Sequence, residues 1–176
     1  MTGALPFADR LVAFLPNMRR FALSLSGSAD TADDLVQAAC ERALANQDSF
    51  DLSTRFDAWT FRIIRNLWID QIRRRRTAGQ PEDIVDHEEA PGLTELPDVF
   101  PRMELREVSA AIGELSQEQR EVLMLVCVED FSYRETAEIL SLPIGTVMSR
   151  LARARRNLAV ACGIIDDADR SPGQKG

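Results

Sequence analysis

The chain of 176 residues is 45% hydrophobic, as folded proteins usually are, and its 28 acidic and 21 basic residues give a net charge of −7. Its longest purely apolar run, from Val122 to Val128, is about a third of the length of a membrane-spanning helix, so we expect no membrane insertion. Three scattered cysteines and a single histidine argue against a disulfide framework and a Cys/His metal site, and we expect a cytoplasmic protein without a cofactor.

The acidic residues are unevenly distributed along the chain. Residues 1–76 carry 11 Lys and Arg against 9 Asp and Glu, residues 77–104 carry 1 against 8, and residues 105–160 carry 7 against 8. Most of the negative charge therefore comes from one segment. The overall charge does not exclude nucleic-acid binding by the remainder of the chain.

Helical periodicity is strong in residues 1–76 and strand signals are almost absent from the chain, so we predict an all-α fold. Three helices are expected, at approximately residues 15–26, 30–46 and 57–76. Pro16 is tolerable in the opening turn of the first helix, and Gly27 ends it. Together these helices form a first domain, residues 1–76.

Residues 77–104 contain four prolines, eight acidic residues and no sustained periodicity. Such a segment buries too little apolar surface to offset the entropic cost of ordering it. We therefore predict a flexible acidic linker between two small helical domains.

The second predicted domain covers residues 105–165 and is followed by a frayed tail, 166–176. Its first helix holds the apolar positions 105, 108 and 112. Ser116 and Gln119 have capping-box spacing and open a helix that continues through residue 128. Ser132 and Glu135 have the same spacing and start a short helix that ends near residue 140. A tight turn and a helix at about 144–161 complete the domain.

The short helix, the turn and the final helix have the order and lengths of a helix-turn-helix. The apolar residues of the final helix fall within one narrow arc, which we predict to be buried: Val147, Leu151, Ala154 and Leu158. The opposite face carries Gly145, Ser149, Ala152, Arg153 and Arg156, with Arg150 and Arg155 on its flanks. Small residues allow close approach to a major groove, and arginine binds guanine or phosphate bidentately. DNA binding is favoured over the alternative of a solvated basic face.

A polar and basic stripe runs along one side of the third helix, at spacings of i, i+4, i+8 and i+11: Arg62, Asn66, Asp70 and Arg73. The helix then ends in the run Arg73–Arg76. A basic stripe beside aromatic residues suits single-stranded or melting nucleic acid. The run can equally satisfy the helix dipole. The aromatic side chains Trp59, Phe61 and Trp68 are more often core residues than base-stacking platforms.

The second helix has a polar face with Asp34, Gln37 and Glu41 at i, i+3 and i+7. The residues alone do not distinguish a partner site from a solvated face. Cys40 and Cys127 lie on apolar helix faces, so we expect both to be inert core residues. The sequence contains no phosphate-binding glycine loop and no nucleophile or metal arrangement, and therefore no catalytic residue is predicted.

Two groups of motifs resemble bacterial extracytoplasmic-function (ECF) sigma factors of the sigma-70 family. Residues 33–37 and 56–66, followed by Asp70 and Arg73–Arg76, resemble conserved region two of that family. Residues 115–123, 131–140 and 145–155 resemble region four. The resemblance covers about residues 11–76 and 105–160, in the family's order and spacing.

The resemblance implies a protein that joins core RNA polymerase, directs it to promoters and helps open the duplex. Four residues would lie on the helix that grips the coiled coil of the largest core subunit: Asp34, Leu35, Gln37 and Glu41. The stripe of Arg62, Asn66, Asp70 and Arg73 would lie near the −10 element. Ser149, Arg150, Arg153 and Arg156 would lie at the −35 element. The resemblance also implies contact with the polymerase flap, a dedicated anti-sigma factor and no obligate homo-oligomer.

The sequence departs from the family pattern at two positions. Met148 stands where Lys or Arg is frequent, which removes one contact to the DNA backbone or to a base and leaves the −35 preference open. Asp130 stands where Gly is frequent. A rival hypothesis is a stand-alone helix-turn-helix regulator that binds duplex DNA without polymerase. Under that hypothesis the stripe on the third helix would be idle, and Asn66→Ala would leave activity intact.

Overall fold

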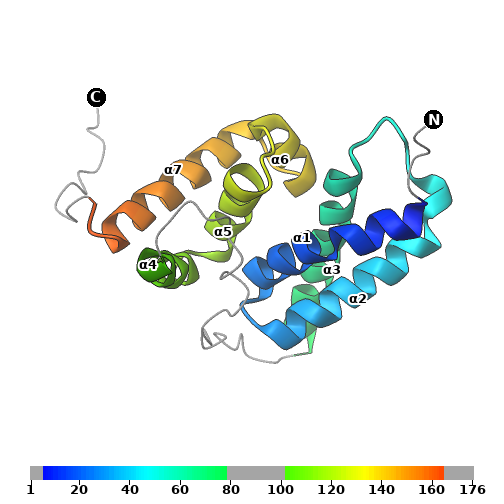
Figure 1. Cartoon of the computed structure of the whole chain (residues 1–176), viewed down its shortest axis with the longest axis horizontal. Coiled ribbons are helices and arrows are strands. Elements are labelled where there is room, and N and C mark those ends of the chain that lie inside the picture. Colours follow the sequence, from blue (N-terminus) through cyan, green and yellow to red (C-terminus); the bar gives the residue numbers. More distant parts are fainter. Residues whose placement is uncertain (1–5, 79–101, 165–176) are drawn as a thin grey trace.

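The computed structural model describes residues 6–78 and 102–164, and all regular structure in these residues is helical, as predicted (Figure 1). The first domain contains α1 (Phe7–Ser26), α2 (Ala29–Ala45), a 3₁₀ turn η1 (Gln47–Ser49) and α3 (Phe56–Thr77). The second contains α4 (Arg102–Gly113), α5 (Gln117–Leu123), a π-helical turn η3 (Met124–Val128), α6 (Tyr133–Leu140) and α7 (Ile144–Ala161). None of the described helices has the length and hydropathy needed to cross a membrane.

The boundaries of the predicted linker shift at both ends. Thr77 belongs to α3, and residues 102–104 belong to α4. The rest of the predicted linker, and the predicted frayed tail 166–176, lie outside the described residues.

Helix α1 begins at Phe7, well before its predicted start near residue 15. The prediction was wrong because Phe7 and Leu11 extend the apolar stripe towards the N-terminus and pack against the core. Pro16 consequently lies inside the helix rather than in its opening turn. It is exposed, so water can replace the backbone hydrogen bond that proline cannot donate. Gly27 ends the helix as predicted, in the left-handed conformation with φ of 67°.

The core of the first domain forms between large side chains of α1 and α3 and small ones of α2. Phe21 and Phe61 are fully buried, with ring centroids 4.8 Å apart. Helix α2 contributes Ala32, Ala39 and Ala43, whose small side chains allow it to approach the other two helices closely. The predicted preference for core positions is confirmed for Phe61 and Trp68, while Trp59 is half-buried in an aromatic cluster with Phe7, Phe50 and Phe56.

Side-chain caps define where the helices of the second domain begin. The predicted capping box of α6 is complete, because Ser132 and Glu135 each bond to the backbone N–H of the other. At α5 the Ser116 hydroxyl accepts from the Gln119 N–H, but the Gln119 side chain accepts from Asn157 at 3.1 Å. Only half of the predicted box is therefore formed there.

The helix that starts at α5 continues to Val128 as predicted, but its last part is a π-helical turn. The Glu129 N–H donates to the Met124 carbonyl at 3.0 Å, which is the i to i−5 pattern of a π-helix. Asp130 follows in the left-handed conformation, with φ of 56°. Glycine adopts this conformation most readily and aspartate tolerates it, which explains why either residue suits this position. Cys127 is exposed on this turn, so its predicted core position was wrong.

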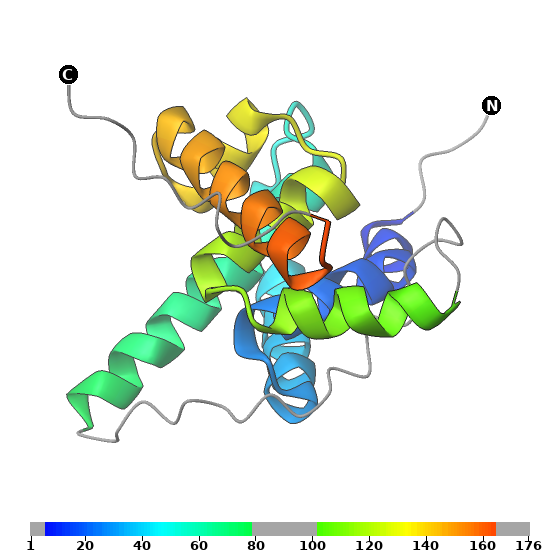
Figure 2. The same ribbon diagram turned by 90° about the vertical axis from the view of Figure 1, so that its left-hand side faces the viewer.

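The two domains pack directly on each other (Figures 1 and 2). The sequence does not determine whether they do so. Helix α1 contacts α5, and α3 contacts α6. Phe131, just before α6, is 2% exposed, and its ring centroid lies 5.8 Å from that of Phe61 in α3. Buried residues of both domains therefore form one continuous apolar cluster.

Candidate polymerase and DNA interfaces

The polar face of α2 is open to solvent. Asp34, Gln37 and Glu41 are all exposed, and Gln37 donates to Glu41 through a bond of 3.2 Å along the helix. Leu35 is different, because it is only 4% exposed and belongs to the core. In this structure Leu35 holds α2 in place, and the other three residues form the accessible surface.

The polar stripe of α3 is partly accessible. Asn66 and Arg73 are exposed, whereas Arg62 and Asp70 are half-buried. The Nε atom of Arg62 is buried without a hydrogen-bond partner among the described residues. Figure 2 shows the C-terminal half of α3 projecting away from the second domain, so the arginine run at residues 73–76 stands clear of the packed core.

The faces of α7 match the prediction. Val147, Leu151 and Ala154 are buried and Leu158 is half-buried. The opposite face is exposed throughout: Gly145, Ser149, Ala152, Arg153 and Arg156. Arg150 has a different environment, because its side chain is 19% exposed and lies 2.9 Å from a carboxylate oxygen of Glu118. Of the four predicted −35 residues, Ser149, Arg153 and Arg156 lie on the accessible surface.

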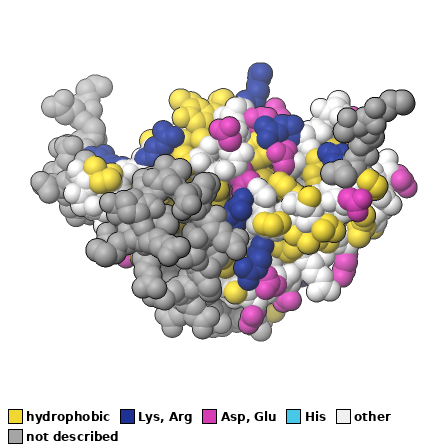
Figure 3. Space-filling model, in the orientation of Figure 1, with side chains coloured by type: hydrophobic (Ala, Val, Ile, Leu, Met, Phe, Trp, Pro, Cys, Tyr) yellow, Lys and Arg dark blue, Asp and Glu magenta, His cyan; other side chains and the backbone are white. Residues whose placement is uncertain are grey.

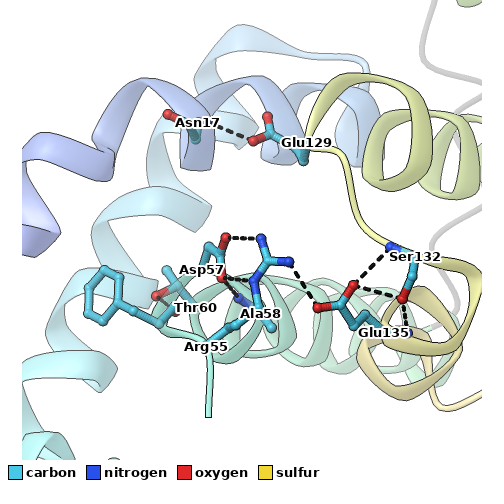
Figure 4. Close-up of polar contacts among 9 residues, drawn as sticks. Asn17, Arg55, Asp57, Ala58, Thr60, Glu129, Ser132 and Glu135 are labelled. Atoms are coloured by element: carbon cyan, nitrogen blue, oxygen red, sulfur yellow. Dashed lines mark hydrogen bonds and ion pairs between the residues drawn. The ribbon is translucent and has the colours of Figure 1, made fainter. Parts of the chain in front are cut away.

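A second set of charged residues joins the domains. Glu129, whose side chain is 6% exposed, accepts a hydrogen bond from Asn17 at 2.7 Å (Figure 4). It also accepts one from Arg20 at 3.1 Å. Arg65 of α3 lies 3.5 Å from Glu121 of α5, and both side chains are largely buried. In each ion pair the first domain supplies the arginine and the second supplies the glutamate.

Arg120 makes a further contact across the same interface. Its Nε donates to the Ser24 carbonyl of α1 at 2.9 Å. Its Nη1 donates to the carbonyls of Gly113 and Leu115, both at 2.8 Å. One guanidinium therefore closes the turn between α4 and α5 and bonds to the C-terminal part of α1.

Arg55, at the start of α3, binds a carboxylate on either side (Figure 4). It pairs with Asp57 at 2.7 Å and with Glu135 of α6 at 2.9 Å, and its guanidinium carbon lies 4.3 Å from the centre of the Phe131 ring. Hydrogen bonds from the Ser132 hydroxyl and N–H, and then from Arg55, lower the pKa of Glu135. The capping box of α6 is therefore also an interdomain contact.

The interdomain roles of these residues could not be predicted from the sequence. Glu135 has a local signal, its spacing from Ser132, but that signal identifies only a helix cap. Glu129 and Glu121 have no local signal that connects them to Arg20 or Arg65, which lie more than 50 residues away.

The comparisons with known proteins agree with this arrangement of two helical units. Residues 11–78 match the family model "Sigma-70 region 2", and residues 105–158 match "Sigma-70, region 4". The ECF RNA polymerase sigma factor EcfG of Rhodopseudomonas palustris is 44% identical over 161 residues, which cover 92% of this chain and 87% of that protein. The chain belongs to the ECF RNA polymerase sigma factors.

Other relatives are similar along most of their length. SigW of Bacillus subtilis, also an ECF sigma factor, is 33% identical over 165 residues, with 86% of each chain covered. Among solved structures, the sigma factor RpoE of Bartonella quintana, in complex with the anti-sigma factor NepR, has a TM-score of 0.74 and 37% identity and covers 90% of this chain and 97% of that one. CnrH in complex with the cytosolic domain of CnrY has a TM-score of 0.61 and 29% identity and covers 93% of this chain and 88% of that one.

The predicted binding residues and the interdomain residues of this sigma factor differ in their exposure. Regions 2 and 4 of the sigma factor leave exposed most of the residues predicted to bind polymerase or DNA. Arg65, Glu121 and Glu129, none of them predicted as site residues, are engaged between the regions.

The lowered pKa of Glu135 predicts a pH-dependent contribution to stability. Because this pKa is lower in the folded than in the unfolded state, the contribution is present above the ordinary glutamate range, about pH 4.3, and is lost as the pH falls through the lowered value. Urea denaturation should show Glu135→Gln to be less stable than the wild type at pH 7, and the difference should shrink below about pH 4.

Glu138→Gln is the matched control for this measurement. Glu138 is exposed on the same helix and takes no part in the capping box or in the ion pair with Arg55. A stability difference between wild type and Glu135→Gln that stays constant from pH 7 to pH 3.5 would contradict the assigned contacts.

Proposed function

We propose that this sigma factor binds core RNA polymerase through the exposed face of α2 formed by Asp34, Gln37 and Glu41. The face is accessible along about two turns, and its carboxylates suit a basic partner surface. Leu35 supports the face from below, because its buried side chain fixes the helix to the core. The partner is the coiled coil of the largest core subunit, and the second domain meets the flap.

The stripe on α3 is proposed to bind the melted −10 element. Exposed Asn66 can hydrogen-bond to an unstacked base, while Arg62 and the arginine run 73–76 can bind the sugar–phosphate backbone. Opening the duplex requires no covalent chemistry from the chain. Capture of unstacked bases shifts the equilibrium from closed to open DNA by differential binding.

The outward face of α7 is proposed to enter the major groove of the −35 element, which is wide enough for an α-helix. Arg153 and Arg156 are exposed beside Ser149, so one face offers both base contacts and phosphate contacts. Arg150 would join them only after leaving Glu118. The observation that carries the function is the match of both regions together with these accessible faces.

The packed arrangement cannot bind both promoter elements at once. Elements centred at −35 and −10 are roughly 85 Å apart along the duplex, at about 3.4 Å per base pair. A compact chain of 176 residues has a radius of gyration of about 16 Å, and therefore a diameter of about 40 Å. Promoter binding must separate the domains. The 24 residue steps from Ala78 to Arg102 can extend to at most about 80 Å, which is enough to do so.

Binding to polymerase would favour separation of the two domains. Each domain alone neutralises few phosphates and should bind DNA weakly, but polymerase that holds both at the promoter spacing turns two weak events into one strong one. An anti-sigma factor is proposed to act in the opposite direction and to keep the chain from polymerase. Two similar sigma factors have been solved with a bound protein: RpoE with the anti-sigma factor NepR, and CnrH with the cytosolic domain of CnrY.

Charge reversal on α2 tests the polymerase contact. Asp34→Arg should weaken binding to purified core polymerase by about tenfold or more, because it places a cation against a basic surface. The measurement is competition for core against a labelled wild-type chain. Asp48→Arg, which makes the same change at an exposed position of η1, should bind as the wild type does. Equal binding by the two variants would contradict the assignment of α2.

Run-off transcription tests the −10 contact. With core polymerase and genomic promoters, Asn66→Ala should lower initiation on duplex templates by about tenfold, because one base contact typically contributes 1–3 kcal/mol. A template with a premelted −10 region should recover much of this loss. Unchanged activity on duplex DNA would favour the stand-alone regulator, which also predicts specific operator binding without polymerase.

Small-angle scattering tests whether the interdomain ion pairs hold the domains together. Glu129→Arg places a second cation beside Arg20 in a largely buried site, so the variant should have a larger radius of gyration than the wild type. Glu114→Arg makes the same change at an exposed position and should leave the radius unchanged. Equal radii for Glu129→Arg and the wild type would show that this pair does not hold the closed arrangement.

A further inference from the structure

An exposed apolar patch lies on one flank of the helix-turn-helix. It consists of Ile144 at the start of α7 and Met148 one turn later, which are 49% and 51% exposed and, four residues apart, lie next to each other on the helix surface. Figure 3 shows hydrophobic side chains at the top of the second domain, next to basic ones. Adjacent exposed apolar side chains on the helix proposed to enter the major groove are placed to contact the apolar groups of bases.

The packing of the domain does not account for the patch. The buried arc of α7 runs through Val147 and Leu151, which are both 2% exposed or less. Met148 and Ile144 lie beside this arc on the solvent side. Gly145 lies between them and the DNA-facing residues, and a Cβ at Gly145 would meet nothing within 4 Å. The fold therefore tolerates a side chain there, and its absence leaves room for a close approach to the patch.

The charges around the patch favour an anionic occupant. Arg155 lies two turns beyond Met148 on the same flank, and its guanidinium contacts the Cys127 sulfur at 3.8 Å. Interactions with Cys127 and then with Tyr133 raise the pKa of Arg155, so it remains a cation on this flank of the helix. Arg134 of α6 and Arg153 of α7 are also exposed. An apolar surface bordered by arginines fits a surface that carries both phosphates and methyl groups.

We infer that Met148 and Ile144 contact the C5-methyl groups of thymines in the −35 element, and that this contact sets a preference for thymine. The inference rests on the proposed function, because it places α7 in the major groove. Apolar contact with the thymine methyl group is one of the direct means of base recognition there. The thioether chain of Met148 is unbranched and flexible, so it can follow the edge of one or two bases. A Lys or Arg at this position would instead add a phosphate contact.

Replacing thymine by deoxyuridine tests this inference, because it removes the methyl group and keeps every hydrogen-bonding group of the base. Holoenzyme made from core polymerase and the full-length chain is bound to promoters carrying single thymine-to-deoxyuridine changes in the −35 element. For at least one position the wild type should lose about fourfold in affinity, the value expected for one buried methyl group. Met148→Ala should bind the thymine promoter more weakly and be insensitive to deoxyuridine at that position.

Ile164→Ala is the control, because Ile164 is 76% exposed and lies beyond the end of α7. This variant should retain the full deoxyuridine penalty. The inference is overturned if deoxyuridine is neutral at every position, or if its penalty is the same in Met148→Ala and Ile144→Ala as in the wild type. A holoenzyme that binds no promoter would overturn the proposed function itself, and this inference with it.

Discussion

The arrangement of the molecule depends on arginine–glutamate pairs between its two domains, grouped around the contact of Phe61 with Phe131. Within the described residues, each of these pairs has its arginine in the first domain and its glutamate in the second. Largely buried pairs such as Arg20–Glu129 and Arg65–Glu121 add little net stability, since desolvation offsets their attraction. A single unpaired charge left in the interface is costly, however. The pairs therefore select one way of packing the domains more than they strengthen it.

Helix α3 links this packing to the proposed binding of DNA. Phe61 and Arg65 face the second domain, and Arg55 at its start binds Glu135. Asn66, next to Arg65 in sequence, is exposed, and the helix continues beyond the interface to the arginine run. The same helix thus holds the closed arrangement on one side and carries the proposed −10 contacts on another. A change in the interface would alter how this helix is held without changing its polar stripe.

The second domain has a comparable division of roles. The π-helical turn and the left-handed Asp130 direct Glu129 and Phe131 towards the first domain, while the complete capping box fixes the start of α6. Glu135 belongs to both features, because it caps α6 and binds Arg55. The helix-turn-helix is consequently held against the first domain by residues at and just before the start of α6. The arginines and the apolar patch on α7 stay on the outer surface.

The sequence by itself determined the all-helical fold, the extent of α7, the capping box of α6 and the buried arc through Val147 and Leu151. All of these depend on residues within a few turns of one another, where periodicity and capping chemistry are visible. The start of α1, the π-helical turn, the burial of Leu35 and the exposure of Cys127 were decided by packing between helices. Only the tertiary structure could pair Glu129 with Arg20, more than 100 residues away, because no local pattern records which charges meet when two domains close on each other.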